Sequence, residues 1–253
     1  MLTKELWIPC DGMRLSAILD VPAEGPRPIV VVIHGFSGYK EERHIVAVSE
    51  GLNELGFATL RVDMYGHGHS DGQFRDHTLI KWITNAMTAI DYARSLDFVT
   101  DLYLCGHSQG GLMVMLAAAL ERDRVKGVIP MSPAAMIPER ARQGELLGIK
   151  FDPDHFPEAL EYKEGFTLGD SYLRVAQMID VNAAIDLFHG PVLIVHGDAD
   201  EAVPVQVGID CAKRYRDCKL VLIPGDDHCY DYHLDQVVDA IKAWMEPRFD
   251  GLR

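Results

Sequence analysis

The chain has 253 residues, of which 48% are hydrophobic and 25% are charged, a balance typical of a globular protein and unlike that of a disordered or fibrous chain. This length fits one compact fold that carries a small insertion. The 38 acidic residues outnumber the 24 basic residues, which gives a formal net charge of −14. A surface this negative repels nucleic-acid phosphates and anionic lipid headgroups, so we expect neither nucleic acid nor a membrane as a partner.

The cysteines and the amino-terminal segment indicate a reducing compartment. The five cysteines are odd in number and form no CxxC pair, which argues against a disulfide framework and against a zinc site. The amino-terminal segment turns polar after eight residues, and no stretch reaches the roughly 18 apolar residues of a membrane span. We therefore expect a cytoplasmic protein.

The pattern along the chain alternates between strands and helices. Residues 5–8 and 14–19 predict a β-hairpin at one edge of a sheet. Short apolar, β-branched runs predict strands at residues 29–34, 58–63, 102–106, 125–131, 192–196 and 220–223. Apolar residues at helical spacing predict helices over residues 43–55, 78–95, 111–120, 205–215 and 231–245. This alternation predicts an α/β fold, a mostly parallel sheet with helices on both faces.

One long connection interrupts the alternation. About 55 residues separate the strand that ends near Met131 from the strand that begins at Val192, far more than the roughly 10 to 15 that a crossover helix needs. The aromatic residues of this segment are Phe151, Phe156, Tyr162, Phe166 and Tyr172. A decorative insertion is one interpretation, but long ordered insertions often act as lids. We therefore divide the chain into a core, residues 1–132 and 188–253, and an inserted cap, residues 133–187.

The segment Gly106-His107-Ser108-Gln109-Gly110 has the pattern GxSxG and lies directly between a predicted strand and a predicted helix. Small residues at the flanking positions permit a sharp turn that lifts the serine hydroxyl above the sheet, at a helix N-terminus that favours a developing anion. Ser108 is therefore the candidate nucleophile. The alternative is a serine that only caps the helix.

A serine hydroxyl becomes a good nucleophile when an imidazole takes its proton and a carboxylate orients that imidazole. On this architecture the partners should follow later strands. Asp200 and His228 come after the last two predicted strands and are the candidate acid and base. Asp198 is the alternative acid, because it lies nearer its strand, and His233 is the alternative base.

Acyl transfer also needs two backbone N–H groups that stabilise an oxyanion. One is expected from Gln109, directly after the nucleophile, and the other from Phe36 in the loop after the first parallel strand. A metal site at His67 and His69 is disfavoured, because no nearby acidic pair completes a coordination set. We expect no metal and no other cofactor.

The motifs HGFSG, RVDMYGHGHSDG, GHSQGG, HGDADEAVP and GDDHC occur in the order used by the α/β-hydrolase family, and the resemblance covers nearly the whole chain. The cap pieces PDHFP and YLRVAQ resemble those of bacterial cinnamoyl (feruloyl) esterases. The resemblance implies an α/β-hydrolase fold with a cap (lid) subdomain. It matches Ser108, Asp200 and His228 to the triad, and Phe36 and Gln109 to the oxyanion positions.

The same resemblance matches Tyr172, in the YLRVAQ piece, to an aromatic residue that reaches the phenolic end of the substrate. We place His34 and His107 beside Tyr172 among the candidate substrate-binding residues. The stretch 136–147 departs most from the family pattern, so the groups that hold the phenolic hydroxyls stay unassigned.

The resemblance implies hydrolysis of hydroxycinnamate esters such as ferulates, caffeates, coumarates and chlorogenate. The expected partner is a small aromatic ester, and a homodimer is compatible with the sequence. The alternative within the same fold is a general carboxylesterase or monoacylglycerol lipase. A serine aminopeptidase, an acyltransferase and an inactive binding module are weaker alternatives. The sequence fixes neither the alcohol half of the ester nor the preferred ring substitution.

Overall fold

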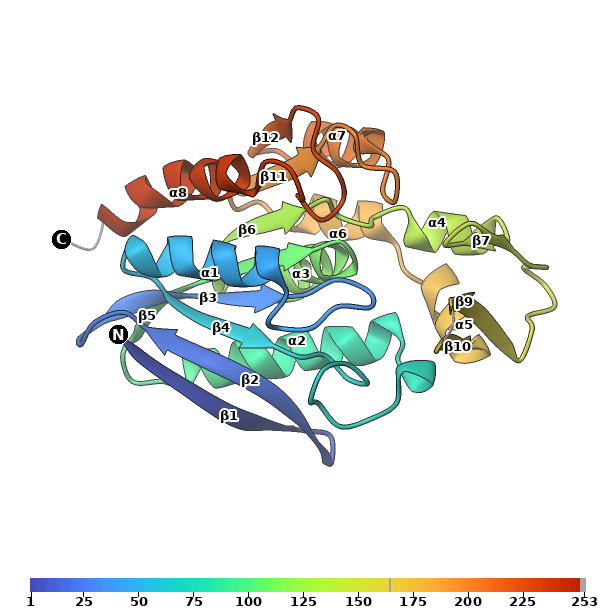
Figure 1. Ribbon diagram of the computed structural model, residues 1–253, viewed down its shortest axis with the longest axis horizontal. Helices are drawn as coiled ribbons and strands as arrows, with labels where there is room; N and C mark the ends of the chain where they lie inside the picture. Colours follow the sequence, from blue (N-terminus) through green and yellow to red (C-terminus); the bar gives the residue numbers. More distant parts are fainter. Residues whose placement is uncertain (164, 251–253) are drawn as a thin grey trace.

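The computed structural model describes residues 1–163 and 165–250. Residue 164 of the expected cap and residues 251–253 of the expected core lie outside the described residues. A large twisted sheet is flanked by helices, and a smaller unit of short helices and strands lies beyond one end of it (Figure 1). Within the described part, no helix is long and apolar enough to cross a membrane.

The main sheet has eight strands in the order β1-β2-β4-β3-β5-β6-β11-β12. β1 pairs with β2, and β2 with β4, in antiparallel register, whereas the pairs from β4 to β12 are parallel. The strands are β1 (Leu2–Cys10), β2 (Met13–Val21), β3 (Arg27–Ile33), β4 (Ala58–Val62), β5 (Val99–His107), β6 (Val125–Met131), β11 (Val192–Gly197) and β12 (Cys218–Ile223). The predicted hairpin and the six further strands are confirmed.

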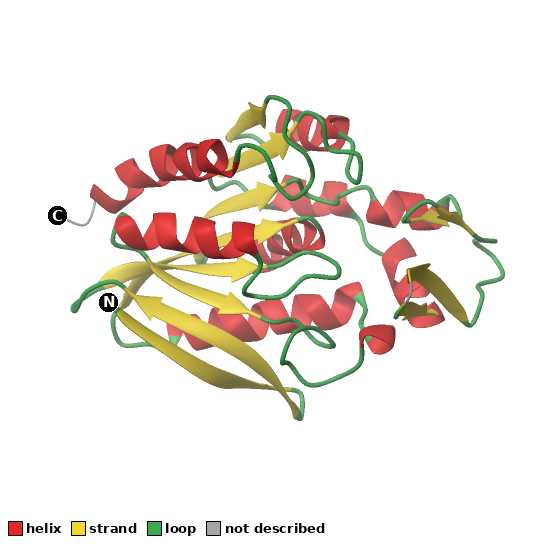
Figure 2. Ribbon diagram, in the orientation of Figure 1, coloured by secondary structure: helices red, strands yellow, loops and turns green. Residues whose placement is uncertain are grey.

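Helices cover both faces of the sheet (Figure 2). Apolar side chains of α1 (Arg43–Glu54) and α8 (Leu234–Asp250) pack on one face. Those of α2 (Leu79–Arg94), α3 (Gln109–Leu120) and α7 (Val205–Arg214) pack on the other. The α/β fold with helices on both faces is therefore confirmed.

The last helix was predicted to begin at residue 231, and this start is wrong by three residues. Its first turn is replaced by a hydrogen-bonded loop, in which Asp227 accepts from the backbone N–H of Asp231 and Asp226 accepts from that of Tyr232. His233 therefore lies just before α8 rather than inside it. The helix also continues five residues beyond its predicted end.

The inserted segment contains most of the smaller unit. It holds α4 (Ile137–Arg142), β7 (Glu145–Leu146), β8 (Ile149–Lys150), β9 (Ala159–Lys163), β10 (Phe166–Gly169), α5 (Asp170–Gln177) and α6 (Val181–Leu187). All but α6 lie past the carboxyl ends of the parallel strands, at the right of Figure 1, where the short 3-10 helix η1 (Phe74–Asp76) meets β10. α6 instead packs against α3 and α7 of the core, because Ala184 and Ile185 are buried there.

Helix α3 lies unusually close to the sheet. Its residues from Gln109 to Ala119 are all buried, so it is apolar around its whole circumference. A Cβ atom at Gly110 would lie 2.3 Å from the carbonyl oxygen of His34 and 2.4 Å from that of Ile33. Glycine is thus required where α3 crosses the end of β3. This crossing fixes how far the residue before the helix lies above the sheet.

We expect Gly110→Ala to destabilise the protein, because a methyl group would push α3 away from the backbone of β3. The free energy of unfolding should fall by at least about 2 kcal/mol, as for other overpacked cores. Urea-induced unfolding measures this change. An unchanged midpoint would show that α3 can move without cost, and would remove the close crossing as a structural constraint.

Candidate active site

Ser108 occupies the sharp turn between β5 and α3. Its backbone has φ 56° and ψ −119°, a left-handed conformation that side chains other than glycine rarely adopt. Hydrogen bonds over-determine this strained position: the Ser108 N–H donates to the Met131 carbonyl at 2.9 Å, and the Ser108 carbonyl accepts from Ala134 at 3.0 Å. The turn therefore presents the Ser108 hydroxyl at the carboxyl edge of the sheet.

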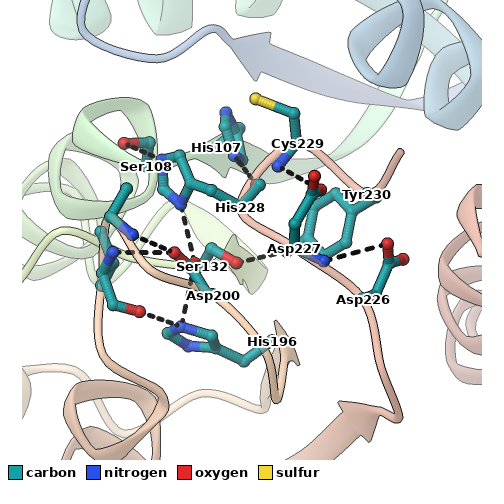
Figure 3. Close-up of polar contacts among 12 residues, drawn as sticks. His107, Ser108, Ser132, His196, Asp200, Asp226, Asp227, His228, Cys229 and Tyr230 are labelled. Carbon is teal, nitrogen blue, oxygen red and sulfur yellow. Dashed lines mark hydrogen bonds and ion pairs between the residues drawn. The ribbon is translucent and has the colours of Figure 1, made fainter. Parts of the chain in front are cut away.

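His228 lies between Ser108 and Asp200 (Figure 3). Its Nε2 is 2.9 Å from the Ser108 Oγ, and its Nδ1 is 2.7 Å from the Asp200 Oδ2. The three residues come from the loops after β5, β11 and β12, so parallel strands deliver them to one edge. This geometry lets the imidazole accept the hydroxyl proton while the carboxylate orients the ring.

Asp200 is held as an anion by its surroundings. Its Oδ1 accepts the backbone N–H groups of Ala202 at 2.9 Å and Val203 at 2.8 Å. Its Oδ2 also lies 3.3 Å from Nε2 of the buried His196. Burial raises the pKa of Asp200, but the hydrogen bonds from His196 and His228, together with the charge of His228, outweigh burial and lower it. The carboxylate therefore stays ionised at neutral pH.

The loop that carries His228 is tied to the core by side chains that sequence reasoning missed. The Tyr230 hydroxyl donates to the Val195 carbonyl at 3.1 Å. It is also 2.9 Å from the Ser132 Oγ (Figure 3). Tyr230 is fully buried and has φ 59°. The only signal in the sequence was a tyrosine two residues after the candidate base. Its partners lie 35 and 98 positions away, so the sequence did not identify them.

The two alternative residues have other roles. Asp198 is exposed, and its Oδ1 accepts the backbone N–H of Gly225 at 2.6 Å. It thereby links the loop after β11 to the loop after β12. His233 belongs to the turn before α8. The structure brings Ser108, Asp200 and His228 together and leaves Asp198 and His233 outside this arrangement.

Phe36 and Gln109 flank the serine. Gln109 is the first residue of α3, and the N–H at this position has no intrahelical partner. Phe36 lines the cavity in front of Ser108, and its carbonyl accepts from the His67 Nε2 at 2.9 Å. His67 therefore holds the Phe36–Ser37 peptide, which directly follows the Phe36 N–H that is expected to act as an oxyanion donor.

His34 and His107 act on the backbone. His34 is fully buried, its Nδ1 donates to the Gly35 carbonyl at 2.8 Å, and its Nε2 accepts from the Met64 N–H at 3.0 Å. Both ring nitrogens are thus engaged by backbone groups, and His34 is not among the residues that line the cavity. His107 does line the cavity, but its Nε2 donates to the His228 carbonyl at 2.7 Å. Its visible role is to hold the His228 loop.

Tyr172 lies in the cavity wall with its hydroxyl turned toward α3. The side chain is fully buried, and the hydroxyl donates to the Gln109 Oε1 at 2.6 Å. Burial raises the pKa of the Tyr172 phenol, so the group stays a neutral donor. The expected partner of this hydroxyl was a substrate phenol, and the structure gives it Gln109 instead.

The cavity in front of Ser108 is largely apolar and extends under the cap. Toward the cap it is lined by Met136, Ile137, Leu146, Leu147 and Tyr162 of the inserted segment and by Ala202 of the loop after β11. The same six residues also line a second cavity, between the cap and the loop after β11, which contributes Glu201 and Pro204 as well. That second cavity has a polar end, where Arg140 and Glu145 form an ion pair. Between Ser108 and this ion pair the shared walls are aromatic and aliphatic.

Buried histidines cluster behind Phe36 without forming a metal site. Burial lowers the pKa of His34 and of His77 to about 3, so both rings are neutral at physiological pH. They pack with His67 against Trp82. Among residues 1–163 and 165–250, no group of three or more His, Cys, Asp or Glu side chains could hold a metal ion.

The fold and this Ser–His–Asp arrangement define the α/β-hydrolase class, and the chain is a carboxylic ester hydrolase of that class. The family model described as serine aminopeptidase, S33, matches residues 24–160, more than half of the chain. The chain belongs to this family. The resemblance to α/β-hydrolases and to bacterial feruloyl esterases that the motifs indicated is confirmed.

Similar proteins span several activities. Est1E from Butyrivibrio proteoclasticus, in a structure with ferulic acid bound, is 59% identical, with a TM-score of 0.94 over 95% of this chain and 97% of that chain. The human mitochondrial palmitoyl-protein thioesterase ABHD10 is 26% identical over 87% of this chain and 76% of its own length. A monoacylglycerol lipase from Mycolicibacterium smegmatis is 24% identical over 92% of this chain and 93% of its own length.

We expect Asp200→Asn to lower kcat by about 10⁴-fold, because an amide cannot hold the imidazole in the required tautomer. Asp198→Asn removes the same charge two residues away and serves as the matched control, with kcat staying within about threefold of the wild-type value. Steady-state hydrolysis of p-nitrophenyl butyrate measures both. A larger loss in Asp198→Asn than in Asp200→Asn would exchange the two roles.

Proposed function

We propose that this chain hydrolyses hydroxycinnamate esters through a Ser108–His228–Asp200 triad. Ser108 attacks the ester carbonyl while His228 takes its proton, and Asp200 orients the imidazole and stabilises its positive form. The backbone N–H groups of Phe36 and Gln109 stabilise the oxyanion. The alcohol leaves with the proton from His228. Water activated by the same histidine then releases the aromatic acid.

The main support for an aromatic acyl group in the substrate is the cavity that runs from Ser108 under the cap. Its walls include Phe36, Tyr162 and Tyr172, and the Phe36 ring meets the Tyr162 ring edge-on with 5.5 Å between centroids. A planar cinnamoyl group gains dispersion and edge contacts from such walls. The ferulic acid bound to Est1E, at 59% identity, supports the same substrate class.

The apolar path is also compatible with an aliphatic chain. The thioesterase and the monoacylglycerol lipase among the relatives act on acyl groups of that kind, by their names. A general carboxylesterase or monoacylglycerol lipase is therefore the second candidate function. The polar Arg140–Glu145 end of the cap cavity favours the phenolic substrate, because an alkyl terminus would desolvate that ion pair without a compensating contact.

The five cysteines are free, which supports a reducing location, and we propose the cytoplasm. No metal or other cofactor takes part in the proposed mechanism. Only the unprotonated form of His228 can accept the serine proton.

A substrate panel tests the proposed function. We expect kcat/KM for methyl ferulate and methyl caffeate to exceed that for p-nitrophenyl butyrate and monoolein by about tenfold or more, because a hydrocarbon chain makes no compensating polar contact with the Arg140–Glu145 ion pair that it desolvates. Ser108→Ala, assayed in parallel, measures the background rate. A wild-type preference for butyrate or monoolein over every cinnamate would replace the proposal by the second candidate.

We expect Tyr172→Phe to lower kcat/KM for methyl cinnamate and methyl caffeate by the same factor, about five- to tenfold. The reason is that the lost hydroxyl leaves the buried Gln109 amide unpaired and disturbs the start of α3, whichever acyl group is bound. A loss confined to caffeate would instead assign the hydroxyl to the substrate phenol, as the sequence suggested.

A further inference from the structure

The cavity in front of Ser108 has a second end, on the side away from the cap. Ser37, Gly38, Glu42 and Cys229 line this end, and none of them lines the cavity under the cap. In the proposed reaction the leaving oxygen takes its proton from His228. With the acyl group under the cap, the alcohol half of the ester must therefore extend toward the end formed by Glu42 and Cys229.

Glu42 turns its carboxyl toward the cavity, although a carboxylate at its position could instead cap the N-terminus of α1. It is the N-cap residue of α1, where a carboxylate usually accepts backbone N–H groups of the first turn, yet its side chain makes no such cap. Its Oε2 is buried, and no donor within the described residues forms a hydrogen bond with it. A Cβ atom at Gly38 would lie 2.2 Å from this oxygen, so the glycine leaves room for the carboxyl.

Neighbouring cations do not neutralise this carboxyl. Arg43 pairs with Asp231 at 2.7 Å, and Lys40 pairs with Asp63 at 2.7 Å. The remaining titratable groups that face Glu42 are His44, His228 and Cys229. The His44 Nε2 is 3.8 Å from Glu42 Oε2, but burial lowers the pKa of His44 to about 4, so it is neutral. Burial raises the pKa of the Cys229 thiol to about 11.

We propose that Glu42 selects the alcohol half of the ester by charge: it accepts hydrogen bonds from neutral hydroxyl-bearing or cationic alcohols and repels anionic ones. This inference rests on the proposed function for the direction in which the ester lies. Burial raises the pKa of Glu42 to about 7, while the nearby backbone of Tyr39 and the charge of His228 act in the opposite direction. Glu42 is therefore charged above neutral pH and neutral below it, and selection strengthens as pH rises.

Chlorogenate and its methyl ester test the proposal, because they share the caffeoyl group and differ only in one carboxylate on the alcohol half. At pH 8.5 we expect wild-type kcat/KM to favour the methyl ester by about fivefold, the effect of two like charges roughly 4 Å apart in a water-like dielectric. In Glu42→Gln this ratio should fall to within twofold of one. Glu41→Gln removes an equal charge from the next residue, whose carboxylate lies beside Lys40 outside this cavity, and should leave the ratio unchanged.

A measurement on the wild type needs no variant. The ratio should fall toward one between pH 8.5 and pH 5.5, because Glu42 gains a proton while the carboxylate of chlorogenate stays ionised. Any effect of pH on the shared catalytic steps changes both rates equally and cancels in the ratio. A ratio that is independent of pH and unchanged in Glu42→Gln would overturn the proposal, as would an equal change in Glu41→Gln.

A second substrate pair separates this proposal from the proposed function. If the wild type hydrolyses neither caffeoyl ester, the hydroxycinnamate assignment fails by itself. Butyrylcholine and 3,3-dimethylbutyl butyrate, a cationic and a neutral ester of similar shape, then report on Glu42. We expect wild type to favour butyrylcholine at pH 8.5 by about fivefold, and Glu42→Gln to remove this preference. Equal preferences in both proteins would overturn the role of Glu42.

Discussion

The active-site arrangement depends on the close crossing of α3 over the end of β3. A Cβ atom added to Gly110 would lie 2.3 Å from the His34 carbonyl oxygen. This proximity forces the preceding turn to be sharp. Ser108 then adopts φ 56°, at a backbone strain of about 1 to 3 kcal/mol. The strain persists because the Ser108 N–H and carbonyl are both held by neighbouring backbone. The fold thus fixes the hydroxyl before any substrate arrives.

Around that fixed point, buried polar groups hold the other two members of the triad arrangement. Asp200 is kept charged by two backbone N–H groups and by His196. His228 is held through its backbone, by His107 and by the buried Tyr230 that follows it. The imidazole is therefore already aligned in the folded protein, before substrate binds. Acyl transfer needs preorganisation of this kind.

Much of the core could be predicted from the sequence because its signals are local. The strands are short apolar runs, and the GxSxG turn carries its own steric requirement, so both the fold and the position of Ser108 follow from neighbours in the chain. The partner of the Tyr172 hydroxyl could not be predicted, because Gln109 lies 63 positions away and nothing near Tyr172 specifies it. The role of His34 was missed for the same reason: its partner Met64 is set by how β3 and β4 pair. The start of α8 was missed because Asp226 and Asp227 compete for its first N–H groups.

Trapping the acyl-enzyme tests the central claim most directly. Wild-type protein is mixed with excess methyl ferulate, quenched in acid within milliseconds and digested, and the peptides are weighed by mass spectrometry. The account predicts one feruloyl group on the peptide that contains Ser108, and none on the same peptide of Ser108→Ala. Steady release of ferulate with no feruloyl group on Ser108, or with the group on another residue, would contradict it.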